Sequence, residues 1–171
     1  FSRQIGQLVN LSNLVDNWLF FQAIGGFDNS NKNVYYAARN ENGNYRGYFI
    51  PWDLNISFGA VYADNKYYAE ETLEETGTQV QFEPGCRAIA LDADHARALA
   101  KEKWEDWKEK AFTAEALLER AQHLQQELTG SGAMAREMER WPGGNASTDL
   151  SLLTEFTKQR MAYMDSMIDG L

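Results

Sequence analysis

The stretch Asp28–Gly59, DNSNKNVYYAARNENGNYRGYFIPWDLNISFG, decides the fold of the first third of the chain. Its residues 33–39 and 45–51 are rich in aromatic and other strand-forming side chains. Residues 40–44 between them, Asn-Glu-Asn-Gly-Asn, are typical of a turn. The stretch therefore predicts a β-hairpin within residues 33–51.

The segment before this hairpin has helical periodicity. Apolar side chains recur at intervals of three and four residues from Leu11 onward, and Gly25-Gly26 then supplies a stop signal. This pattern predicts a helix over about residues 10–25. Its apolar positions are Leu11, Leu14, Val15, Trp18, Leu19 and Ala23.

The segment after the hairpin loses periodicity between Gly59 and about Cys86. Loops of this length in compact domains are often functional, so we expect a mobile, substrate-facing segment here. The Glu-rich run within residues 70–75 is interpreted as a solvated part of this loop.

Residues 92–171 are helical in pattern. A helix is predicted from Asp92 or Asp94, a second from Thr113 to about Leu128, and a short third from Ala133 to Trp141. The last helix is expected to start at a cap formed by Ser147 or Thr148. We expect these side chains to face the core: Leu99, Trp104, Trp107, Ala111, Trp141, Leu152, Leu153, Phe156, Met161, Met164 and Ile168.

Composition indicates one globular folding unit. The chain has 171 residues, of which 44% are hydrophobic and 24% charged. The predicted fold class is α+β and mostly helical. A net charge of −9 argues against a nucleic-acid partner. No run is long enough for a membrane span, and Cys86 has no second cysteine to pair with.

Three polar residues around the hairpin suggest phosphotransfer chemistry. Transfer of a phosphoryl group needs a carboxylate near the acceptor hydroxyl and oxygen ligands for the metal ions on the phosphates. Protein kinases supply a loop Asp, an Asn five positions later and a second Asp beyond a short hairpin. Here Asp28 and Asn33 have that spacing, and Asp53 follows the hairpin. Lys32 is placed to neutralise charge on the transferred group.

The surroundings of Asp53 differ from those of an ordinary loop residue. Asp and Asn are common in loops, where they form Asx turns without any catalytic role. Asp53, however, follows a strand and lies among aromatic residues in FIPWDLNISFG. Such surroundings predict a carboxylate that a cation or strong donors must compensate. His95 and His123 have no partnering motif and are expected to be surface or interhelical residues.

Several motifs resemble the CotH kinase family, atypical kinases related to spore-coat protein H. The stretches that carry the resemblance are Leu14 to Leu19 (LVDNWL), Asp28 to Asn33, and Ile50 to Gly59 with its Pro-Trp-Asp element. The resemblance is densest over residues 10–60. It continues weakly through Arg136–Trp141 and the final helix with Arg160.

The resemblance implies the C-terminal lobe of a protein-kinase-like fold, which transfers phosphate from ATP to Ser or Thr of a protein substrate with Mg or Mn. By position, Asp28 corresponds to the catalytic Asp, Asn33 to a metal ligand and Asp53 to the principal metal ligand. The family commonly has Asp where this chain has Asn55, a neutral oxygen ligand that weakens this metal position.

The resemblance covers only part of a kinase. No Gly-x-Gly-x-x-Gly loop is present, and the chain starts at Phe1, so we expect an excised or processed, partial CotH-like domain over residues 1–171 without its N-terminal lobe. The isolated chain is then expected to be inactive or nearly so, even if its parent is a kinase. The alternative is a pseudokinase-like scaffold or a surface binding or adhesion module. Family resemblance suggests a spore-coat or cell-surface location, and the oligomeric state is left open.

Overall fold

The computed structural model describes residues 4–29, 32–60, 83–110, 112–144 and 147–171. Near its start lie the short helix α1 (Ile5–Leu8) and the helix α2 (Leu11–Ile24). Helix α2 begins where the Asn10 side chain accepts a hydrogen bond from the Asn13 N–H, and it ends at Gly25 with φ of 62°. The predicted helix over residues 10–25 is confirmed.

The hairpin is also confirmed. Strand β1 (Val34–Glu41) pairs antiparallel with β2 (Asn44–Pro51), and Val34 lies opposite Pro51. The two turn residues Asn42 and Gly43 have φ of 54° and 92°. Two successive positive φ angles are those of the primed turns that match strand twist, and Asn-Gly tolerates them well.

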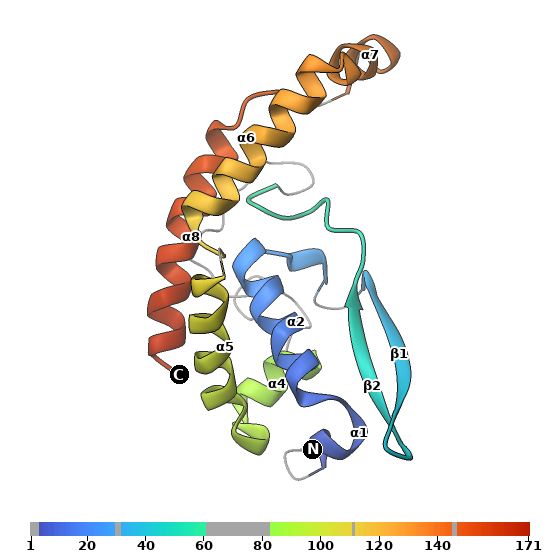
Figure 1. Cartoon of the computed structure of the whole chain (residues 1–171), viewed down its shortest axis with the longest axis vertical. Coiled ribbons are helices and arrows are strands. Elements are labelled where there is room, and N and C mark those ends of the chain that lie inside the picture. The colour runs from blue at the N-terminus through green and yellow to red at the C-terminus, as the bar shows by residue number, and fades with distance from the viewer. Residues whose placement is uncertain (1–3, 30–31, 61–82, 111, 145–146) are drawn as a thin grey trace.

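The hairpin packs beside α2 through β2 (Figure 1). Asn13 of α2 accepts a hydrogen bond from the Phe49 N–H at 2.7 Å and donates to the Phe49 carbonyl at 3.2 Å. Asn17, one turn later, donates to the same carbonyl at 3.0 Å. The Phe49 side chain is buried, so both its backbone and its ring join the sheet to the helix.

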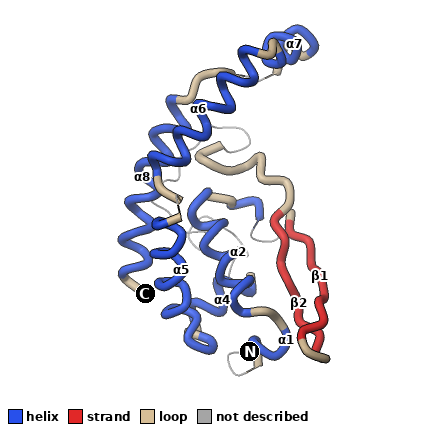
Figure 2. Tube along the Cα trace, in the orientation of Figure 1, coloured by secondary structure: helices blue, strands red, loops and turns tan. Residues whose placement is uncertain are grey.

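The remaining elements of the described chain are helical. They are the 3-10 turn η1 (Phe27–Asn29), α4 (Pro84–Ala90), the 3-10 turn η3 (Ala93–His95), α5 (Ala96–Glu109), α6 (Ala114–Gly130), α7 (Ala133–Arg140) and α8 (Ser151–Asp169). Figure 2 shows α2 between the hairpin on one side and α5 and α8 on the other. Helix α6 runs along the N-terminal part of α8 and carries α7 at its far end (Figure 1).

The core lies between α2, α4, α5 and α8. It contains Leu14, Trp18 and Leu19 of α2, Trp104 of α5 and Met164 of α8, all buried. The predicted helical stripe is thus confirmed at Trp104, Phe156, Met161, Met164 and Ile168, all buried, whereas Leu99 and Trp107 are partly buried. Ala111 and residues 61–82 of the loop expected between Gly59 and about Cys86 lie outside the described residues, and the end of that expected loop is helical, because α4 begins at Pro84.

Three expectations about the C-terminal part were wrong. Trp141 is 57% exposed, because α6 and α7 extend away from the core and bury none of their residues. Leu152, in the first turn of α8, is 38% exposed. The cap of α8 is Leu150, with no side-chain cap bond, while the Ser147 hydroxyl instead accepts from the Asp149 N–H.

The fold class is therefore α+β, mostly helical with a small antiparallel sheet. Both histidines are exposed, as predicted for surface positions. Within the described ranges, no helix combines the length and the apolar character that a bilayer span requires.

Candidate functional site

The end of α2 positions Asp28. The chain leaves the helix through Gly25 in the left-handed region, and the Gly26 N–H donates to the Phe21 carbonyl at 2.9 Å. One turn of 3-10 helix, η1, then follows, closed by the Asn29 N–H donating to the Gly26 carbonyl at 2.9 Å. Asp28 is thereby held on a short turn anchored to a buried helix.

The Asp28 carboxylate is bound by two of the predicted site residues. Asn33 Nδ2 donates to Asp28 Oδ2 at 2.7 Å, and Lys32 Nζ lies 3.0 Å from Oδ1. The Asp28 side chain is only 12% exposed, whereas that of Lys32 is 62% exposed. Two donors on one carboxylate fix its orientation.

Asn33 connects the loop to the end of the hairpin. Its φ is 58°, and its carbonyl accepts from the Trp52 N–H at 2.9 Å. Because Nδ2 points to Asp28, the Asn33 side-chain oxygen is turned elsewhere, and no described residue donates to it. This oxygen is therefore available to a ligand.

Asp53 lies immediately beyond this contact. Its side chain is exposed and makes no hydrogen bond or ion pair with any described residue, and its φ is 52°. The expectation that aromatic neighbours desolvate this carboxylate was wrong: the adjacent Trp52 is itself 57% exposed, with its ring 5.1 Å from that of Tyr35. The aromatic residues cover the sheet and leave the carboxylate in water.

The segment after Asp53 returns to α2. Asn55 is exposed, and the Ser57 hydroxyl donates to the Leu54 carbonyl at 2.6 Å. The Phe58 N–H then donates to the Ile24 carbonyl, the last residue of α2, at 2.6 Å. Asp53 and Asn55 thus lie on a short connection that is held at one end by Asn33 and at the other by the last residue of α2.

Asn29 is a site residue that sequence reasoning missed. It is 1% exposed, and its Nδ2 donates both to the Asn33 carbonyl at 3.0 Å and to the Trp52 carbonyl at 2.8 Å. The run Asn29-Ser30-Asn31 offers three similar polar residues. Nothing in that pattern distinguishes the inward side chain from its neighbours.

The structure thus brings Asp28, Lys32 and Asn33 into direct contact and fixes the backbone next to Asp53 against them. No hydrogen bond or ion pair links the side chains of Asp53 or Asn55 to the other three within the described chain. These two residues are connected to the site through the main chain of Trp52.

The donor set fits a hard divalent cation. The exposed Asp53 carboxylate and the free Asn33 side-chain oxygen are the oxygen ligands that Mg²⁺ and Mn²⁺ prefer. Among the described residues, no three His, Cys, Asp or Glu side chains gather as a complete metal cage. Mg²⁺ in phosphotransfer sites commonly takes only one or two protein carboxylates, with water and substrate phosphates supplying the rest.

A separate groove of about 450 Å³ lies between α2, β2 and α5. None of the predicted site residues lines it. Its walls are Asn13, Asp16, Asn17, Phe20, Phe49, Ile50, Pro51 and Trp107.

Comparison with known proteins gives one match. The family model described as CotH kinase protein matches residues 1–164, which is nearly the whole chain. No curated protein and no solved structure matches.

Proposed function

We propose a phosphotransfer function for this chain, which belongs to the CotH kinase family: in the full-length protein it moves the terminal phosphate of ATP to a Ser or Thr of a protein substrate. The observation that carries the proposal is the oriented Asp28 carboxylate, held by Asn33 and Lys32 beside the segment that bears Asp53. On this proposal, the helices and the hairpin form the C-terminal lobe of a protein-kinase-like fold.

Asp28 acts on the acceptor hydroxyl. Its carboxylate accepts the Ser or Thr proton as the hydroxyl oxygen forms its bond to the terminal phosphorus. The bond from that phosphorus to the bridging oxygen breaks, and ADP leaves with the electron pair. The hydrogen bond from Asn33 Nδ2 to Oδ2 fixes the direction in which the Asp28 carboxylate points.

Asp53 and Asn33 supply the oxygen atoms that would hold Mg²⁺ or Mn²⁺, with Asn55 as a neutral third donor. Such an ion, when bound, neutralises the ATP phosphates and stabilises the charge that develops on them. Lys32 forms an ion pair with Asp28, and its positive charge would lie beside the phosphate that is transferred.

Substitution of the two carboxylates should affect different steps, phosphate transfer for Asp28 and Mg–ATP binding for Asp53. Asp28→Asn should cut phosphate transfer by roughly 10²- to 10⁴-fold and leave Mg–ATP affinity nearly unchanged, because Asp28 acts on the hydroxyl. Asp53→Asn should weaken Mg–ATP binding by roughly tenfold or more. The measurements are isothermal titration with Mg–ATP and transfer of labelled phosphate, on the longest available form of the protein.

The control is Asp106→Asn, an exposed carboxylate on α5 that pairs with Lys110 and with no other described residue. It should change neither readout. If the parent binds no Mg–ATP or Mn–ATP, transfers no phosphate, and both variants behave like the parent, the kinase proposal is wrong.

A pseudokinase-like scaffold or surface binding module is the second candidate. Two observations favour it: Asn55 replaces the acidic residue common in the family, and Asp28 is already ion-paired with Lys32. The experiment above separates the two, since a scaffold keeps its fold and its partner in all three variants without metal-dependent ATP binding. The family's name also suggests spore-coat association, which remains part of the proposal for either function.

A further inference from the structure

We propose that Asn29 is the positioning residue of this site, the side chain that sets the distance between the Asn33 and Asp53 ligands. The inference rests on the proposed function and adds to it a residue outside the Asp-x4-Asn pattern. Asn29 does not face the reactants. It acts through the main chain of the two segments that carry the metal ligands.

The Asn29 side chain joins two main-chain segments, and we call its pair of hydrogen bonds the Asn29 bridge. One planar amide nitrogen donates to the Asn33 carbonyl at 3.0 Å and to the Trp52 carbonyl at 2.8 Å. The first carbonyl belongs to a proposed ligand itself, and the second belongs to the residue that precedes Asp53. A single amide group therefore fixes the separation of two segments, one just before β1 and the other just after β2.

Both segments need such support because their backbones are strained. Asn33 has φ of 58° and Asp53 has φ of 52°, in the left-handed region, which Asn and Asp enter more readily than other non-glycine residues but still at a cost. Strained residues keep their conformation only when surrounding contacts over-determine it. The Asn29 bridge and the Trp52 N–H bond to the Asn33 carbonyl supply those contacts.

The other end of the Asn29 side chain shows what this arrangement costs. Its Oδ1 is buried and accepts no hydrogen bond from any described residue. Buried polar atoms without a partner are rare, and each calls for a specific reason. Here the reason is that the nitrogen end must reach two carbonyls, and the oxygen is turned towards Gly26, where an added Cβ would lie 3.3 Å from it.

Asn17 provides a matched comparison inside the same protein. It is 6% exposed, its Nδ2 also donates to two main-chain carbonyls, those of Asn13 at 2.8 Å and Phe49 at 3.0 Å, and its Oδ1 also lacks a partner. It joins α2 to the middle of β2 and contacts none of the site residues. If Asn29 had only a structural role, substitution of Asn29 and substitution of Asn17 should therefore have the same effects.

The first test measures metal affinity in paired variants. Asn29→Ala and Asn17→Ala should lower the melting temperature by similar amounts, because each removes two buried hydrogen bonds. Only Asn29→Ala should weaken Mn²⁺ binding, measured by electron paramagnetic resonance with and without ATP, by about 10- to 100-fold, as expected for the loss of a group that orients ligands. Equal loss of Mn²⁺ affinity in both variants would overturn the proposal.

The second test does not depend on ligand binding. Amide hydrogen exchange at Trp52, whose N–H donates to the Asn33 carbonyl, should accelerate by about tenfold or more in Asn29→Ala and stay unchanged in Asn17→Ala. Unchanged exchange at Trp52 would overturn the positioning role. A parent that binds no Mn²⁺, combined with faster Trp52 exchange in the Asn29 variant only, would refute the proposed function and leave the bridge established.

Two further variants cover the case in which Asn29→Ala does not fold. Asn29→Ser keeps one donor and should show a smaller change of the same kind. Gly26→Ala presses on Asn29 Oδ1 without removing either hydrogen bond, so it should shift Trp52 exchange in the same direction. Asn29→Asp keeps the shape but turns a carboxylate towards two carbonyls. If Asn29→Asp changed Mn²⁺ affinity and Trp52 exchange less than Asn29→Ser does, packing alone would explain the role of Asn29 and the proposal would fail.

Discussion

Asp53 has an exposed side chain on a strained backbone. Its backbone is in the left-handed region, with φ of 52°, and its side chain is exposed without a partner among the described residues. The backbone strain is of the order of 1 kcal/mol and receives no compensation from the side chain itself. Asp94 in η3 has the same combination, with φ of 49° and an exposed side chain, so strain at an exposed carboxylate does not by itself indicate a ligand site.

This strain predicts an inverted order of stability at position 53. Asp53→Gly should be more stable than Asp53→Ala by about 1 kcal/mol, because only glycine adopts positive φ without a Cβ clash. At Asp106, exposed in the interior of α5, the order should be the opposite by about 1 kcal/mol, since glycine weakens helices. Urea denaturation of the four variants measures both differences. Ala more stable than Gly at position 53 would show that the positive φ is absent in solution.

Asn55 predicts a gain of function. Asn55→Asp adds a charged oxygen two positions after Asp53 on the exposed connection, and it should tighten Mn²⁺ binding by roughly tenfold. Asn44→Asp, at the exposed first position of β2, adds the same charge away from the site and serves as the control. Unchanged affinity in Asn55→Asp would mean that this side chain does not face the metal.

At the scale of single elements, the hairpin is held to α2 by a polar cluster as well as by Phe49. Glu41 of β1 accepts hydrogen bonds from Tyr48 of β2 and, at 2.9 Å, from Asn10, the cap of α2. The Tyr48 hydroxyl and then Asn10 lower the pKa of Glu41, and the same bond with Glu41 raises the pKa of Tyr48. The turn end of the hairpin is thereby connected to the start of the helix.

This cluster predicts a specific pH dependence. Because the folded-state pKa of Glu41 is below its ordinary value of 4.5, its contribution to stability is complete above that value and is lost as the pH falls through the folded-state pKa. Tyr48→Phe removes the main cause of the shift. The free energy of unfolding of this variant should therefore fall less steeply with acid than that of the parent.

The control for this experiment is Tyr45→Phe, a strand residue that is 69% exposed and should leave the acid dependence unchanged. Denaturation in urea at neutral and acid pH measures the slopes. Parallel slopes for the parent and Tyr48→Phe would contradict the role of the Glu41 cluster.

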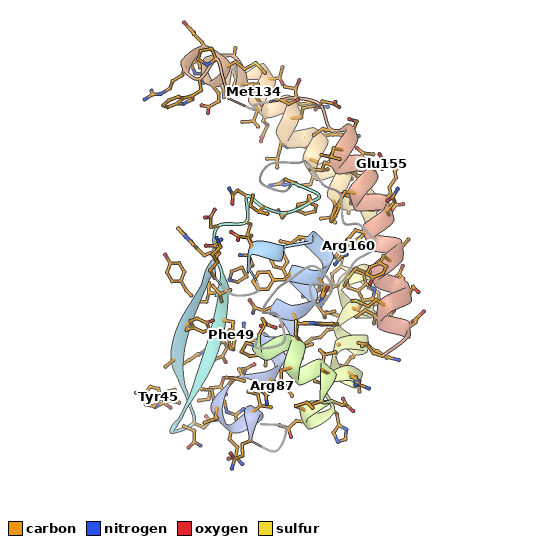
Figure 3. All side chains as sticks on the ribbon, turned by 180° about the vertical axis from the view of Figure 1, so that it is seen from behind. Tyr45, Phe49, Arg87, Met134, Glu155 and Arg160 are labelled. Carbon is orange, nitrogen blue, oxygen red and sulfur yellow. The ribbon has the colours of Figure 1, made fainter. Side chains whose placement is uncertain are left out.

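At the scale of the whole molecule, Arg160 joins the last helix to the first part of the chain. It is fully buried on the side of α8 that faces α2 (Figure 3). Its Nε donates to the Gln22 carbonyl at 2.6 Å, and a terminal nitrogen lies 3.3 Å from Gln22 Oε1. Gln22 is in the last turn of α2, where a cation also complements the helix dipole. The helix end that positions Asp28 therefore depends on α8.

Arg160 should consequently matter for both stability and the site. Arg160→Ala leaves a cavity and removes donors from buried oxygens, so it should lower the free energy of unfolding by about 2–5 kcal/mol. Lys158→Ala, exposed on the same helix, should change it by less than about 0.5 kcal/mol. Thermal and urea unfolding measure both. A small effect of Arg160→Ala would show that α2 ends in the same way without α8.

The arm formed by α6 and α7 shows how far local pattern can mislead. Its helices were predicted correctly as elements, because caps such as Thr113 and glycines such as Gly132 act within a few residues. Trp141 was nevertheless placed in the core, since an aromatic residue at helical spacing is usually buried. Only the position of the arm relative to α8 decides that this side chain meets solvent (Figure 1).

The sequence by itself determined the helix over residues 11–24 and the hairpin with its turn, because these depend on periodicity and on turn residues. Tertiary structure alone decided that Asn29 is buried while Asp53 is exposed, and that Arg160 reaches Gln22. The physical reason is that burial and long-range hydrogen bonds depend on which surfaces meet. A run of similar polar residues does not predict which side chain is buried, because burial depends on how the hairpin, α2 and α8 pack together.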